Sequence, residues 1–114
     1  MNLIISKQEL NKALQQVAKA ISSRSPIPIL SGIKIEATAE QVIFTASDTD
    51  ITIQSFVYPE LNGEIAYELI EPGNAVLPAK IFTDIIRKMP QDQIEIQANE
   101  QFQAIIRSGQ SEIQ

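Results

Sequence analysis

The sequence predicts an α+β domain in which a helix followed by a group of strands occurs twice along the chain. Three observations predict this class. Apolar residues alternate with polar ones over most of the chain, which is typical of half-buried strands. Two separate segments instead show apolar residues at helical spacing, each followed by a group of strand candidates. Isoleucine, a β-branched residue that favours strands, accounts for 20 of the 114 residues.

The first unit begins with a short apolar strand over residues 2–5 and a helix that starts at Ser6. Ser6-Lys7-Gln8-Glu9 fits a capping box, in which the serine hydroxyl and the glutamate carboxylate satisfy orphan N–H groups reciprocally. Leu10, Leu14, Val17 and Ile21 form the apolar stripe. The helix should end near Ser22, because Ser25-Pro26-Ile27-Pro28 cannot continue it.

Three strands follow, over residues 29–37, 41–47 and 50–58. Each has period-two alternation, and the connections between them are short, so they are expected to form a meander. A further strand is predicted over residues 64–70. It lies between turn signals at Asn62-Gly63 and at Glu71-Pro72-Gly73-Asn74.

The second unit repeats this order, although its residues show little identity with those of the first. A short strand over 75–77 leads to Pro78, which sits just before or at the first turn of a helix. Pro90 ends that helix, and its apolar stripe is Phe82, Ile85, Ile86 and Met89. Strands are predicted over 93–98 and 102–108. Another begins at 110 without a following turn, so we expect the chain to stop within its last strand.

Composition excludes several classes of function. The chain has no cysteine and no histidine, which removes disulfides, zinc–thiolate sites and a Ser–His–acid triad. Its 14 acidic residues leave carboxylate-only catalysis open without favouring any one pair. No apolar run is long enough to span a bilayer, and the N-terminus does not resemble a signal peptide. These features predict a soluble intracellular domain.

The net charge of −5 argues against a nucleic-acid partner only if the charges are evenly spread. Residues 7–27 hold four cations against one acid, a net of +3, and residues 78–90 hold three against one, a net of +2. The remainder holds two cations against 12 acids, a net of −10. The two helices therefore carry either ordinary solvated lysines or a positive face that attracts a polyanion. Both interpretations stay open at this point.

Two further features have competing interpretations. Asp48-Thr49-Asp50 resembles an Asp-x-Asp metal pair, but it lies between two predicted strands, where aspartate is a common turn former. We favour the turn. Ile81 flanks the apolar stripe of the second helix, either at the margin of the core or in a subunit contact.

Several segments occur in an order that matches one protein family. They are Ser23-Arg24-Ser25-Pro26-Ile27-Pro28-Ile29-Leu30-Ser31-Gly32-Ile33, Thr45-Ala46-Ser47-Asp48-Thr49-Asp50-Ile51, Glu71-Pro72-Gly73, Val76-Leu77-Pro78-Ala79-Lys80, the helix through Met89-Pro90, and Ile106-Arg107-Ser108-Gly109. In order and spacing they resemble the bacterial DNA polymerase III β subunit, the sliding clamp family. The resemblance runs from the first strand to the last residue, and the Ser-rich and Ile-rich sequence is similar to that of Gram-positive (Firmicutes) members.

The resemblance implies the DNA clamp fold, in which a strand–helix–three-strand unit occurs twice and two helices pack on antiparallel sheets. It also implies that residues 1–114 are the first domain of a three-domain protomer, truncated within its last strand. Two protomers would close a head-to-tail homodimer ring around duplex DNA, with the helices lining the hole. The implied function is a non-enzymatic, sequence-independent tether that makes the replicative polymerase processive in the bacterial cytoplasm. No cofactor or metal is implied. DNA polymerase III and the clamp loader would bind through domains absent from this chain.

The resemblance also implies site residues. The expected DNA contacts are Arg24, Lys12, Lys80 and Arg87, together with Lys19, which is placed by its helical angle alone. The expected protomer interface consists of Ile81, Ile85, Arg107 and Ile113. Glu112 departs from the family pattern, since that edge often carries a basic residue. A small carboxylate- or metal-dependent enzyme built around Asp48 and Asp50, or a plain β-rich interaction module, remains the alternative.

Overall fold

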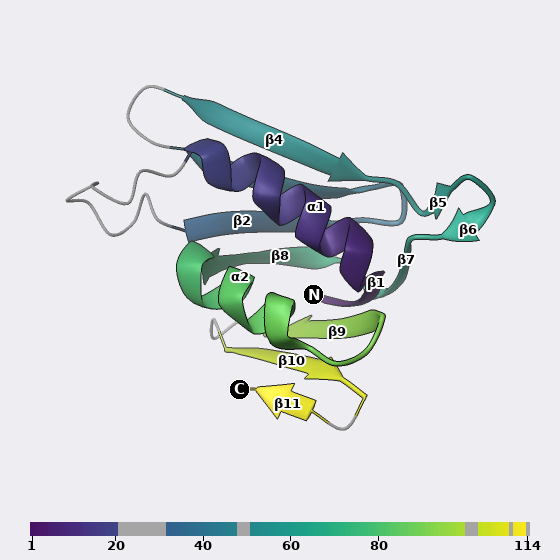
Figure 1. Cartoon of the computed structure of the whole chain (residues 1–114). Helices are drawn as coiled ribbons and strands as arrows, with labels where there is room; N and C mark the ends of the chain where they lie inside the picture. The colour runs from purple at the N-terminus through teal and green to yellow at the C-terminus, as the bar shows by residue number, and fades with distance from the viewer. Residues whose placement is uncertain (21–31, 48–50, 100–102, 110, 114) are drawn as a thin grey trace.

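Two copies of one supersecondary unit make up most of the chain (Figure 1). The computed structural model describes residues 1–20, 32–47, 51–99, 103–109 and 111–113. Its helices are α1 (Lys7–Val17), a 3₁₀ turn η1 (Ala18–Ala20) and α2 (Ala79–Lys88). Its strands are β1 (Asn2–Ser6), β2 (Gly32–Ala37), β3 (Val42–Ser47), β4 (Thr52–Val57), β5 (Glu60–Leu61), β6 (Glu64–Ile65), β7 (Tyr67–Glu71), β8 (Gly73–Pro78), β9 (Gln93–Ala98), β10 (Ala104–Ser108) and β11 (Ser111–Ile113).

The two units exchange their first strands. Each forms an antiparallel meander, β2–β3–β4 in the first and β9–β10–β11 in the second. Strand β1 of the first unit pairs with β9 of the second, and β8 of the second pairs with β2 of the first. The described strands therefore form one sheet in the order β11-β10-β9-β1-β7 and another in the order β4-β3-β2-β8, while β5 and β6 form a separate two-stranded hairpin. The meander predicted for the first unit is confirmed.

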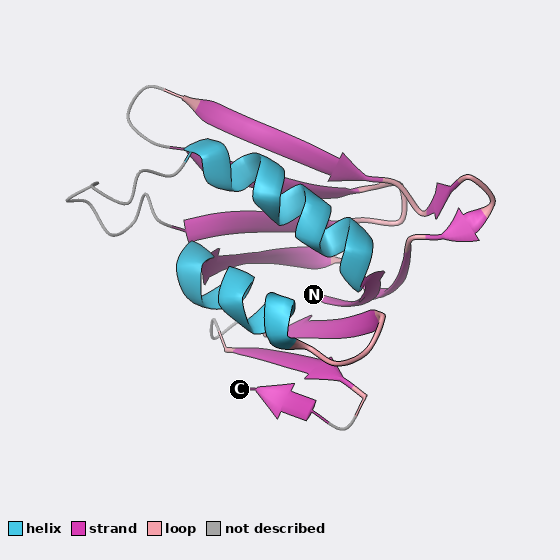
Figure 2. Cartoon of the chain, viewed as in Figure 1, coloured by secondary structure: helices cyan, strands magenta, loops and turns pink. Residues whose placement is uncertain are grey.

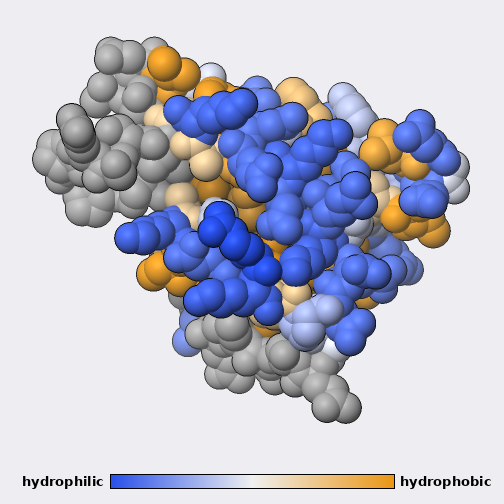
Figure 3. Space-filling model, in the orientation of Figure 1, coloured by the Kyte–Doolittle hydropathy of each residue, from blue (hydrophilic) through white to orange (hydrophobic). Residues whose placement is uncertain are grey.

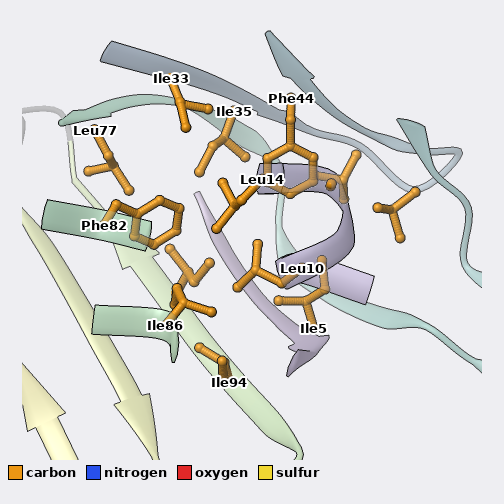
Figure 4. Packing of buried hydrophobic residues seen from close by; sticks show 14 of the residues in the cluster. Ile5, Leu10, Leu14, Ile33, Ile35, Phe44, Leu77, Phe82, Ile86 and Ile94 are labelled. Carbon is orange, nitrogen blue, oxygen red and sulfur yellow. The ribbon is translucent and has the colours of Figure 1, made fainter. Parts of the chain in front are cut away.

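Both helices lie side by side on one face of these sheets (Figure 2). Side chains from both helices and both sheets meet in a single apolar core, shown in Figure 4. Leu14 of α1 is buried there beside Ile35, and Ile86 of α2 is buried near Ile94. Burying a large aliphatic or aromatic side chain contributes about 1.5–3 kcal/mol. The core therefore fixes which face of each helix turns outward.

The first helix begins as predicted, but only half of the expected capping box forms. Ser6 is its N-cap, and its hydroxyl accepts the N–H of Glu9 at 3.5 Å. The N–H of Ser6 instead donates to the carbonyl of Ala66 at 2.8 Å. The Ser6 N–H, which the Glu9 carboxylate would satisfy in a complete capping box, is therefore already bonded to the backbone of Ala66. The predicted end near Ser22 lies outside the described residues.

The single strand predicted over 64–70 is wrong, because it is interrupted at Ala66. Asn62 and Gly63 both have positive φ, 54° and 83°, as a tight two-residue hairpin requires, so the predicted turn there is confirmed. The N–H of Ala66 then donates to Pro59 at 2.8 Å. Its carbonyl bonds to β1, so the chain leaves the β5–β6 hairpin and enters the large sheet at this residue.

The turn predicted at 71–74 is also shorter than expected. Only Pro72 separates β7 from β8, and the strand predicted over 75–77 already begins at Gly73. Proline lacks an N–H and suits the point where the chain passes from one sheet to the other. A Cβ at Gly73 would lie 2.9 Å from the nitrogen of Met1, so the close approach of β1 requires glycine.

Candidate nucleic-acid interface

The outward face of the two helices is covered by polar side chains (Figure 3). Lys12 of α1 and Lys19 of η1 are exposed, as are Lys80 and Arg87 of α2. Lys12, Lys80 and Arg87 lie roughly opposite the buried stripes of their α-helices, as the helical period of about 3.6 residues requires. Lys19 is exposed on the 3₁₀ turn that follows α1. The structure therefore brings these four predicted cations onto one face of the domain.

The acids lie mostly elsewhere. Among the described residues, the helices carry one acid each, Glu9 and Asp84. The remaining described acids lie on strands and loops: Glu36, Glu40, Glu60, Glu64, Glu68, Glu71, Asp92, Glu95 and Glu112. The charge separation inferred from the sequence is thus a separation in space between the helical face and the rest of the surface.

Ion pairs on the sheets sharpen this separation. Lys34 and Arg107 are the described cations that lie on strands. The ammonium of Lys34 lies 3.5 Å from the carboxylate of Glu36, and the guanidinium of Arg107 lies 3.6 Å from that of Glu95. Such exposed pairs contribute little stability, but they leave the sheet surfaces without a surplus of positive charge.

Lys7 belongs to α1 but does not join the exposed cations. Its ammonium donates to the carbonyl oxygens of Met89 at 2.6 Å and of Arg87 at 3.3 Å, at the C-terminal end of α2. Sequence reasoning counted Lys7 with the other helical charges and missed this contact. No local signal reveals it, because its partners lie 80 and 82 residues along the chain.

An apolar groove runs along the other flank of α2. Ile81 is 61% exposed and lines the groove with the half-buried Ile85. Ala104 and Ile106 of β10 form the opposite wall, and the hollow measures about 150 Å³. Sequence reasoning missed Ile106 as a groove residue, although the alternation along β10 turns it toward the helices.

The other two predicted interface residues are placed differently. Arg107 alternates with the buried Ile106 and Ser108, so its side chain lies on the sheet face away from the groove. Ile113 of β11 pairs with Ile106 in the strand register. The structure thus gathers Ile81 and Ile85 at one groove and separates Arg107 from it.

Three predicted site residues, Arg24, Asp48 and Asp50, lie outside the described residues. Within the residues that are described, no cluster of three or more His, Cys, Asp or Glu side chains could hold a metal ion. No helix in the same part of the chain is long and apolar enough to cross a membrane.

The duplicated unit, with two helices side by side on antiparallel sheets, defines the class of DNA-clamp domains. Comparison with known proteins identifies the family within that class. The model of the DNA polymerase III beta subunit, N-terminal domain, matches residues 1–114. The chain therefore belongs to the DNA polymerase III β-subunit family, the family of bacterial sliding clamps, as the sequence predicted.

The relatives agree with this assignment. Over 112 residues the chain is 44% identical to the beta sliding clamp of Bacillus subtilis, covering 98% of this chain and 30% of that protein. It is 42% identical to the beta sliding clamp of Staphylococcus epidermidis with the same coverage. The chain thus spans about 30% of the length of the curated relatives it matches.

Solved structures show the same fold. The DNA polymerase sliding clamp from Bacillus subtilis superposes with a TM-score of 0.94 at 43% identity, covering 99% of this chain and 30% of that one. The β subunit from DNA polymerase of Streptococcus pyogenes gives 0.89 at 34% identity, covering 99% and 29%. The predicted α+β clamp fold and its likeness to Firmicutes members are confirmed.

Proposed function

We propose that this chain is the N-terminal domain of a bacterial sliding clamp that encircles duplex DNA and tethers the replicative polymerase. The observation that supports this most directly is the separation of charge. Exposed cations gather on the face formed by α1 and α2, while both described strand cations are paired with glutamates. A ring of such domains would attract the duplex into its hole and repel it from its outer surface.

The mechanism requires weak contacts. Lysine and arginine side chains contact phosphates without reading bases, so such contacts carry no sequence preference. Many phosphate contacts can be bridged by water and exchanged as the ring slides. Retention on DNA would then come from encirclement rather than from tight binding. The proposal accordingly assigns no catalytic residue, cofactor or metal to this domain.

The proposal extends to the partners of the full-length protein. Ile81 and Ile85 at the α2 groove are proposed to meet the second protomer of a homodimer ring, with Ile113 on the neighbouring strand. Arg24 is proposed as a DNA contact together with Lys12, Lys19, Lys80 and Arg87. Polymerase and clamp loader would bind through the remainder of the protein, which would work in the cytoplasm.

Two variants of the full-length protein test the DNA-facing surface. Lys80→Gln/Arg87→Gln removes two positive charges from the helical face, and Lys34→Glu lowers the charge of a sheet by the same amount. The affinity for a short fluorescent duplex is measured at several salt concentrations. Log affinity falls as log salt rises, and each phosphate contact contributes about 0.9 to the steepness of that fall (the salt slope). The helical variant should therefore reduce the steepness by roughly 2.

The sheet variant has the same net charge and should leave that slope unchanged. Primer extension on a long primed template should also shorten for the helical variant alone. Equal slopes for the two variants would contradict the proposed DNA-facing surface.

A further inference from the structure

The second helix has little local support for its position. It has 10 residues, and isolated helices shorter than about 12–15 residues are marginal in water. Its N-cap, Pro78, makes no side-chain hydrogen bond, and its first turn contains no acid. Met89 ends the helix in an extended conformation, and its N–H bonds to Ile86 at 3.2 Å. The orientation of α2 therefore depends on contacts with other elements.

Lys7 supplies such a contact at the C-terminal end of α2. Its ammonium binds the carbonyls of Arg87 and Met89, where the helix dipole places partial negative charge. The backbone N–H of Lys7 also donates to the carbonyl of Asp92 at 2.7 Å, in the loop that follows. One residue at the start of α1 thus holds both the last turn of α2 and the loop beyond it.

The same loop is held from its other side by Ser108 of β10. The hydroxyl of this buried serine accepts the N–H of Gln91 at 3.0 Å. Loss of the Lys7 side chain would therefore release the α1 side of α2 while the sheet side remains anchored. Such a change tilts or frays the last turn of α2 without unfolding the domain.

We propose that Lys7 is a positioning residue for the DNA-facing surface, which it serves by fixing the turn of α2 that carries Arg87. The proposal rests on the proposed function, because it assigns to Lys7 a role in presenting cations to DNA. Lys7 binds the backbone of Arg87 while the Arg87 side chain is exposed. The ammonium of Lys7 acts through this second cation and makes no phosphate contact of its own.

Three variants of the full-length protein test this role. Lys7→Met removes the ammonium but keeps a long apolar stem, Lys7→Arg restores a cationic donor, and Lys12→Met removes one exposed cation as the matched control. The salt dependence of duplex binding is measured as above. Hydrogen exchange of the α2 amides is followed in parallel, since it reports local opening.

The expected results separate a positioning role from a direct contact. Lys12→Met should lower the salt slope by about 1 and leave exchange in α2 unchanged, because it removes one phosphate contact. Lys7→Met should accelerate exchange in the last turn of α2 at least tenfold and also lower the salt slope. Lys7→Arg should restore both quantities.

Two outcomes would overturn the proposal. If Lys7→Met lowers the slope by about 1 with unchanged exchange, Lys7 contacts phosphate directly. If exchange accelerates while the slope stays at the wild-type value, the contact is only structural. The Lys80→Gln/Arg87→Gln variant separates these failures from failure of the proposed function: if it too leaves the slope unchanged, the DNA-facing surface itself is misassigned.

Discussion

Tyr67 connects the two sheets through a single hydroxyl group. It lies on β7 of the first sheet, is only 4% exposed, and donates to the carbonyl of Thr38, beyond β2 of the second sheet, at 2.8 Å. Burial raises the pKa of Tyr67 above the ordinary tyrosine value of 10.0, and the negative charge of Glu40 raises it further. The neutral phenol is therefore part of the folded state.

This raised pKa predicts a loss of stability at alkaline pH. Above pH 10.0 the unfolded chain releases the Tyr67 proton while the folded chain still holds it, so the free energy of unfolding falls as the pH rises. The contribution is fully present below that pH and is lost as the pH passes through the folded pKa. Denaturant unfolding at intervals of about one pH unit between about pH 8 and pH 11 measures this fall in the free energy of unfolding.

The matched variants are Tyr67→Phe and Tyr58→Phe, the second at a tyrosine that is 56% exposed. Tyr67→Phe should cost about 1 kcal/mol near neutral pH, because the Thr38 carbonyl loses its donor, and should flatten the alkaline fall. Tyr58→Phe should retain the fall. An equal pH dependence in both variants would show that Tyr67 is not its source.

The exposed cations could be predicted at the residue scale, whereas the role of Lys7 could not. Helical spacing places Lys12 and Lys80 opposite their apolar stripes whatever the rest of the fold, because 3.6 residues per turn fixes the angle. The spacing does not tell which neighbour a long side chain reaches. Lys7 binds backbone carbonyls at the end of α2, and every residue type carries such a carbonyl, so the sequence does not indicate the contact.

At the scale of the element, α2 has two apolar surfaces with different roles. Ile86 is fully buried in the core, while Ile81 is 61% exposed at the groove. Ile86→Ala should cost about 2–5 kcal/mol of unfolding free energy, because it leaves a cavity among close-packed side chains. Ile81→Ala should change that free energy by less than about 0.5 kcal/mol. Denaturant unfolding of the two variants measures both effects.

The same pair of variants distinguishes core margin from subunit contact at Ile81. In the full-length protein, Ile81→Ala should weaken self-association severalfold, as measured by analytical ultracentrifugation over a dilution series. The proposed protomer contact at the groove predicts this loss. Self-association equal to that of the wild type would assign Ile81 to the margin of the core instead.

The boundaries of a helix or strand could be predicted where a single residue such as proline sets them. They could not be predicted where pairing with a distant part of the chain sets them. Pro78 and Pro90 bracket α2 in sequence and in structure, because proline cannot donate within a helix. The strand predicted over 64–70 breaks at Ala66 for a different reason. Its backbone groups bond to Pro59 and Ser6, and no local pattern encodes these distant partners.

For the whole molecule, periodicity predicted the repeat and the meander of the first unit but not the exchange of first strands. Alternation shows which side chains of a strand are buried, and both β1 and β8 would bury the same side chains against either meander. Packing of the helices and sheets in the shared core decides which meander each first strand joins. The exchange places β1 beside β9 and β8 beside β2, so the core closes only when both units are present.

This topology makes a prediction about fragments. Residues 1–72 retain β2–β3–β4 but lack β8, which covers the β2 edge, and β1 in them has lost β9. Residues 73–114 retain α2 and β9–β10–β11 but lack β1. Each fragment alone should therefore show no cooperative unfolding transition by circular dichroism, because apolar faces and strand edges stay uncovered.

Mixing the two fragments at equal concentration should restore the strand and helix signal with a midpoint that rises with concentration, because association now supplies the missing pairs. A Leu3→Ala substitution in the first fragment should weaken this recovery. Leu3 is fully buried on β1 and opposes Ile96 of β9, so the change acts directly on the exchanged pairing. Glu68→Ala, at an exposed residue of β7, is the control and should recover normally. A cooperative transition in the 1–72 fragment alone would show that the first unit closes its core without the strand it receives from the second.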